Sequence, residues 1–238
     1  GNESTQFYTS VRWDDRTGYV PINYEERLSG RLNVRTTLRD DLNARVGIGY
    51  TDADTRLAQA ISPGSRWDGV VWGHSGRRGS NGWYVADLPK LDDVSATTEA
   101  QRFTPTLELD HRPAEWFTQT LTVGADLTMT ENGLLFPRGS AAEFGARSRG
   151  LRARSDVKER FTTVDYAATA NFNLTEEIGL STSFGVQHYG ERMEFTAVSG
   201  REFPAAGAET VDAAATNNGA EGVIESKSMG TYLQGRAN

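Results

Sequence analysis

The sequence predicts an all-β fold, an antiparallel transmembrane β-barrel to which this chain contributes about eight strands. Three observations lead to this prediction. Apolar and polar residues alternate over long segments, short and long connections alternate strictly between them, and no apolar run approaches the length of a membrane-spanning helix. Strands in soluble proteins usually have about 5–6 residues, whereas a tilted strand that crosses a bilayer needs about 9–11.

Residues 117–129 show the alternation most clearly. Six of the seven odd positions are apolar and none of the six even positions is. Successive side chains of a strand point to opposite faces, so this segment has one apolar and one polar face. At helical spacing the same apolar residues would scatter around the cylinder, which argues against a helix.

The same period recurs along the chain and defines the other strands. We expect clear strands at 28–38, 42–50, 164–174 and 178–186, and weaker ones at 5–13, 102–111 and 224–237. The apolar faces of 28–38, 42–50 and 117–129 are expected to face lipid. The polar positions Arg31, Asn33, Arg35, Arg45 and Asp126 are then expected to face the lumen.

The connections between these strands alternate in length. Short turns are expected at 39–41, 112–115 and 175–177, and long loops at 15–26, 53–99, 132–158 and 194–222. Outer-membrane barrels combine short periplasmic turns with long extracellular loops in this way. A soluble β-sandwich is the alternative, but it explains neither strands of 11–13 residues nor one loop near 47 residues.

Composition excludes several classes of function. The net charge of −7, from 32 acidic and 25 basic residues, argues against a nucleic-acid partner. There is no cysteine, and the three histidines are far apart and match no catalytic or zinc-binding frame. We therefore expect no enzyme, no catalytic residues, no cofactor and no metal site.

Two segments suggest binding surfaces. The loop at 53–99 combines indole rings with polar groups that suit sugar rings or peptide side chains; its candidate residues are Trp67, Asp68, Trp72, Asn81, Trp83 and Tyr84. The alternative is that these aromatic rings pack the loop against itself or the barrel. The segment 138–160 has seven bases against three acids, and either meets anionic lipid or substrate or is a solvated loop face.

Parts of the N-terminal quarter resemble a known family. Residues 5–13 (TQFYTSVRW) and Gly18-Tyr19-Val20 are followed by residues 24–34 (YEERLSGRLNV) and 42–47 (LNARVG). Together they resemble the first barrel strands after the plug in TonB-dependent transporters of the SusC/RagA type. Nothing in the sequence matches a plug or a TonB box, so residues 1–238 are expected to be a partial barrel domain.

The resemblance implies a 22-stranded barrel in the outer membrane of a Gram-negative-type bacterium. It also implies active import of nutrient oligomers, either glycans or peptides, driven by the TonB complex with a surface lipoprotein of the SusD type. Two alternatives stay open. One is a complete eight-stranded barrel with a structural or adhesive role, and the other is a soluble sugar-binding β-module.

Overall fold

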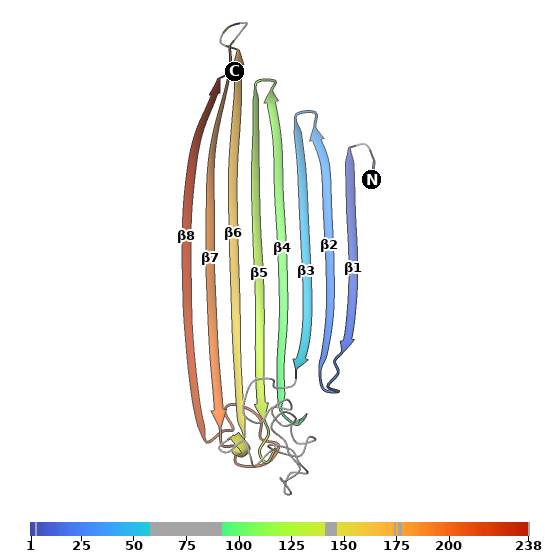
Figure 1. The fold of residues 1–238 in the computed structure, drawn as a ribbon, viewed down its shortest axis with the longest axis vertical. Coiled ribbons are helices and arrows are strands. Elements are labelled where there is room, and N and C mark those ends of the chain that lie inside the picture. Colours follow the sequence, from blue (N-terminus) through green and yellow to red (C-terminus); the bar gives the residue numbers. More distant parts are fainter. Residues whose placement is uncertain (3, 58–91, 141–146, 174, 176–177, 238) are drawn as a thin grey trace, which may run out of the picture.

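The computed structural model describes residues 1–2, 4–57, 92–140, 147–173, 175 and 178–237. These residues form one antiparallel sheet whose eight strands lie side by side in sequence order (Figure 1). The strands are β1 (Thr5–Thr17), β2 (Tyr24–Arg39), β3 (Leu42–Leu57), β4 (Ser95–Ala114), β5 (Phe117–Phe136), β6 (Leu151–Asn173), β7 (Gly179–Arg201) and β8 (Thr216–Ala237). All eight predicted strands are thus present. Within the described residues no pairing joins β1 to β8, so the sheet is open and the self-closed eight-stranded barrel is not observed.

The connections are sorted between the two ends of the sheet. The tight connections β2–β3 and β4–β5 lie at one end, together with both termini, which we call the turn end (Figure 1). The β1–β2 and β7–β8 connections lie at the opposite end, where β3 also ends and β4 begins; we call it the loop end. The predicted alternation of short and long connections is therefore confirmed for these connections.

The strands are longer than predicted, mostly at the loop end; at the turn end β4 continues through Ala114, where a turn was expected at 112–115. β6 and β7 have 23 residues each, and residues 151–158 and 194–201 are strand rather than loop. A strand of that length extends roughly 75 Å at about 3.3 Å per residue, well beyond a hydrocarbon core of about 30 Å. The predicted loop boundaries were wrong because the apolar/polar alternation stops where the apolar surface ends, while the backbone pairing continues.

One face of the sheet carries the predicted apolar residues, and we call it the belt face. The register aligns Val34, Val46, Leu107, Val123 and Val164 in one row across five strands. The last four of these remain 37–38% exposed, so no second layer covers them. The single layer argues against a β-sandwich, since its core would lie between two sheets.

Aromatic residues lie near both limits of this apolar belt. Tyr50 pairs with Phe103 on the loop side. Trp116 stacks on Phe172 at the turn end, with ring centroids 5.3 Å apart. Aromatic girdles at both limits of an apolar band are typical of membrane barrels. Among the described residues, no helix has the length and hydropathy of a membrane-spanning helix.

The opposite face fixes the register of β7 and β8 at two points. Gly185 pairs directly with Tyr232, and Gly222 pairs with Phe195. A Cβ atom at either glycine would collide with the aromatic ring of its partner, so each ring lies over a position without a side chain. Such aromatic–glycine pairs are a recognised means of fixing strand register.

The most buried side chains are at the loop end and not within the sheet. Val94, Phe136 and Phe203 are almost fully buried, and each lies just outside or at the last residue of a strand. Gly150 adopts φ +98°, and the ring of Phe203 fills the space that a side chain there would need. This small core packs the base of the β5–β6 connection against the segment after β7.

Candidate functional site

The sequence singled out one loop surface and one set of lumen-facing residues. The loop residues Trp67, Asp68, Trp72, Asn81, Trp83 and Tyr84 lie outside the described residues. The structure therefore does not test them as a site, and they stay a prediction. The second set lies on β2, β3 and β5, all within the described part of the chain.

Arg31, Asn33, Arg35 and Arg45 share the face opposite the belt, as their register shows. Asn33 pairs with Gly47, Arg35 with Arg45, and Arg31 with Gly49. Arg45 forms an ion pair with Glu108 of β4, and its other terminal nitrogen lies 3.4 Å from Asp110. Within the described residues, neither Arg31 nor Arg35 forms an ion pair. The structure thus brings these four residues together, but only Arg45 is neutralised.

Asp126 lies on the same face two strands away. Arg102 of β4 binds its carboxylate through two nitrogens, with Nε 2.9 Å from Oδ1. The hydroxyl of Thr128 also donates to it. Asp126 is therefore part of a local ion pair rather than one cluster with the β2–β3 arginines. The partners Glu108, Asp110 and Arg102 were missed, although period two within 102–111 places all three on this face.

A hollow of about 450 Å³ lies on this face over β1 to β4. Its lining includes Tyr8, Arg12, Arg31 and Thr104, and it reaches Gly49, where a side chain would collide with the Thr104 hydroxyl. Arg12 is paired with Asp14. Arg31 is exposed and forms no ion pair with any residue that the structure describes, so the hollow suits an acidic group.

The same face differs on β6 to β8, where a group of apolar residues lies among polar ones; Glu191 pairs with Phe161, and Glu159 with Met193. Phe161 stacks on Tyr189 with ring centroids 6.3 Å apart. Val157 pairs with Phe195, and Met193 with Ile224. These six residues are half-buried or exposed, and we call them the aromatic patch. The prediction of a polar face holds only in part in this region, because a wall that is not in contact with lipid is free to be polar or apolar.

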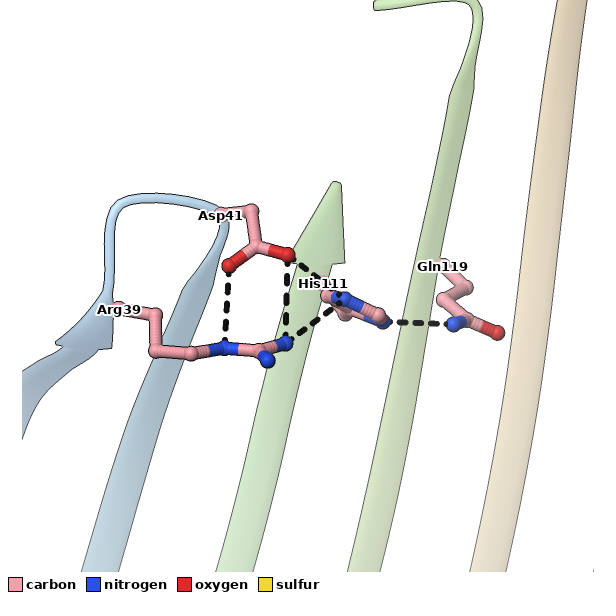
Figure 2. Close-up of polar contacts among 4 residues, drawn as sticks. All are labelled: Arg39, Asp41, His111 and Gln119. Atoms are coloured by element: carbon pink, nitrogen blue, oxygen red, sulfur yellow. Dashed lines mark hydrogen bonds and ion pairs between the residues drawn. The ribbon is translucent and has the colours of Figure 1, made fainter. Parts of the chain in front are cut away.

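A polar cluster ends the belt at the turn end (Figure 2). His111 Nε2 lies 3.1 Å from Asp41, and its Nδ1 lies 2.8 Å from the amide nitrogen of Gln119. The Tyr166 hydroxyl donates to the other amide atom, Oε1 of Gln119, at 2.7 Å. Arg39 forms an ion pair with Asp41 at 3.2 Å. Read in one direction, Tyr166 donates to Gln119, Gln119 to His111, and His111 to Asp41.

The electrostatics of this cluster favour an ionised Asp41. Burial opposes ionisation, but the hydrogen bond from His111, a backbone hydrogen bond and the charge of Arg39 together hold the pKa of Asp41 below its ordinary value of 3.8. The cluster fixes the β2–β3 turn to β4 and β5. No group of three or more potential metal ligands occurs in the described part of the chain.

The basic segment 138–160 is not one loop, as Arg152, Arg154, Lys158 and Arg160 belong to β6. These four residues are each separated from Val164 by an even number of positions, so they lie on the belt face. They lie on the loop side of its apolar part. Arg154 is paired with Glu131 and Asp156. Lys158 and Arg160 are exposed and form no ion pair with a described residue.

Comparison with solved structures finds this sheet in membrane importers. The RagAB peptide transporter matches with a TM-score of 0.77 and 14% identity, over 100% of this chain and 29% of the RagAB chain. The ferric-catecholate import receptor Fiu of E. coli K12 matches with a TM-score of 0.57 and 15% identity, over 99% of this chain and 35% of that one. No protein-family model and no curated protein matches the sequence.

These matches confirm the predicted resemblance at the level of fold. The eight strands have the fold of a segment of the barrel of TonB-dependent transporters, and the RagAB match agrees with the SusC/RagA type. The chain spans 29% of the length of the RagAB chain. One matched protein is a peptide transporter, and the other is an import receptor.

Proposed function

We propose that residues 1–238 form part of the wall of a TonB-dependent transporter that imports nutrient oligomers across the outer membrane. The observation that carries this proposal is the uncovered apolar belt on a single layer of long strands. In water such a face would aggregate, whereas in hydrocarbon it is stabilised. The fold shared with the RagAB transporter supports the same function.

In this proposal the belt face meets lipid and the opposite face lines the lumen of a larger, 22-stranded barrel. Neighbouring strands would then complete the open sheet, since unpaired backbone groups are costly in hydrocarbon. The short turns would lie in the periplasm and the long loops outside the cell. The TonB complex would supply energy, and a surface lipoprotein of the SusD type would cover the loop end.

Of the two substrate classes, peptides fit the opposite face better than glycans. The aromatic patch offers valine, methionine and isoleucine side chains as well as rings. Polar groups such as Glu191 lie beside the rings, but the aliphatic side chains suit apolar peptide residues better than sugar rings. The exposed Arg31 and Arg35 would bind acidic groups of the same substrate or of the plug. The predicted loop residues, from Trp67 to Tyr84, would contribute at the entrance.

Uptake by cells tests this proposal. We expect a labelled peptide mixture to enter cells that produce the full-length protein, and a protonophore or loss of TonB to stop its entry. Met193→Ser with Val157→Ser should lower uptake of apolar peptides several-fold. Val198→Ser is the matched control, because Val198 is on β7 but on the belt face. It should not lower uptake. Uptake of oligosaccharides alone would refute the peptide assignment, and uptake of neither would refute the transporter.

A further inference from the structure

The loop-side edge of the apolar belt changes its charge along the sheet. Moving from the belt toward the loop end on the belt face, the first charged residue of each strand is acidic on β1 to β5 and basic on β6 to β8. The acidic residues are Asp15, Glu26, Asp52, Glu99 and Glu131, and the basic residues are Arg160, Arg192 and Lys227.

The basic residues form one continuous group in the register. Arg160 pairs with Arg192, Arg192 with Glu225, and Gly190 with Lys227. Lys158 lies two residues from Arg160 on the same face. We call Lys158, Arg160, Arg192 and Lys227 the basic edge.

Two glutamates reduce the charge of the basic edge without cancelling it. Glu194 and Glu225 bind Arg192, and Glu225 also binds Lys227. Over these six residues, four bases against two acids leave a net charge of +2; the neighbouring Asp156, on the same face, is paired with Arg154. Lys158 and Arg160 are exposed and form no ion pair among the described residues, and Glu194, which lies opposite Lys158 in the register, binds Arg192 instead. The basic edge therefore has two cations available to a ligand.

The position of these cations indicates what they would bind. On β6 the belt-face residues on the turn side of Arg160 are Thr162, then Val164 and Tyr166. In a membrane, the first charged residues beyond the apolar surface lie at the depth of lipid headgroups. Anionic headgroups attract Lys and Arg at this depth, and phosphate oxygens suit both side chains.

We propose that the basic edge binds the phosphate groups of anionic lipid headgroups in the leaflet on the loop side of the membrane. This inference rests on the proposed membrane location of the chain, but not on transport. The acidic edge on β1 to β5 would not bind such lipids. The protein would therefore hold anionic lipid along one part of its perimeter only.

The experiment uses the full-length protein in nanodiscs of phosphatidylcholine with increasing phosphatidylglycerol, and measures bound phosphatidylglycerol by mass spectrometry. Lys158→Gln with Arg160→Gln should weaken its binding roughly 30-fold, since each cation contributes a factor of about five. The matched control, Glu26→Gln with Asp52→Asn, changes two charges at the opposite edge and should not weaken it. Lys158→Arg with Arg160→Lys should retain binding.

Each other outcome decides against the inference. Equal binding by the glutamine variant would refute the basic edge as the site. Inhibition by inorganic phosphate at the concentration of the lipid would show a site for free phosphate instead. A protein that enters phosphatidylcholine nanodiscs without preferring phosphatidylglycerol would refute this inference alone. A protein that does not enter them would also refute the proposed membrane function.

Discussion

The acidic and basic parts of the belt edge belong to the same sheet and bound the same apolar surface. Along the belt itself, β2 to β6 present one uniform row of aliphatic side chains. At its loop-side edge, the first charged residue is Asp52 on β3 and Arg160 on β6, and the two have opposite charges. Hydrocarbon tolerates almost no variation in polarity, whereas the headgroup region tolerates both charges. The charge of the edge therefore distinguishes β1 to β5 from β6 to β8, whereas the apolar belt is the same in both regions.

The largest expected effect tests whether the belt is the same in both regions. Val123→Arg on β5 and Ala168→Arg on β6 should each lower the free energy of unfolding by roughly 2–4 kcal/mol, because each brings a charge into the middle of the belt. Thr122→Arg, on the opposite face, should have little effect. Urea unfolding of the full-length protein in phosphatidylcholine vesicles measures this. Equal losses at positions 122 and 123 would contradict the assignment of the faces.

A smaller effect tests the edge. Asp52→Arg and Arg160→Asp exchange the charges of the two regions at a depth where a charge costs roughly 0–1 kcal/mol. In phosphatidylcholine both variants should unfold at nearly the wild-type urea concentration. Added phosphatidylglycerol should stabilise Asp52→Arg and destabilise Arg160→Asp. The same response from both variants would mean that the two edges do not differ toward lipid.

The smallest effect concerns the turn end, where Asp41 binds Arg39 and His111 next to the belt. Because the pKa of Asp41 is lowered in the folded protein, its contribution to stability is complete above pH 4 and is lost as the pH falls through the folded value. In Asp41→Asn, the part of the stability that depends on the ionisation of Asp41 should no longer be lost as the pH falls. The midpoint of thermal unfolding between pH 3 and pH 6 checks it, and parallel curves for both proteins would contradict it.

The sequence predicted the fold where one physical constraint acts on alternate residues. Within the belt, lipid-facing side chains must be apolar, so period two reveals the strand and its faces. Beyond the belt, Arg154 and Lys158 stay on the belt face but are no longer apolar, and the period disappears while the strand continues. This explains why all eight strands were found but their loop-side ends were placed too early.

The candidate site was predictable only in part, for a similar reason. Arg31, Arg35 and Arg45 were placed on one face from local alternation. The partners of Arg45 and Asp126 come from β4, and pairing between strands requires the register, which no single segment determines. The aromatic patch was missed because Phe161 and Phe195 interrupt the expected polar face. Nothing forces an inner wall to be polar throughout.

The two aromatic–glycine pairs between β7 and β8 have a consequence for how the sheet is assembled. A slip of two residues would preserve both faces, so polarity alone cannot reject it. It would, however, place Phe195 opposite Ala220 or Ile224 and Tyr232 opposite Ser183 or Gln187, so that each ring would lose the position without a side chain over which it now lies. The two pairs lie ten positions apart along β7. A β8 strand in the wrong register would therefore lose both aromatic–glycine pairs. This loss favours correction of the register early in folding over a trapped, misregistered sheet.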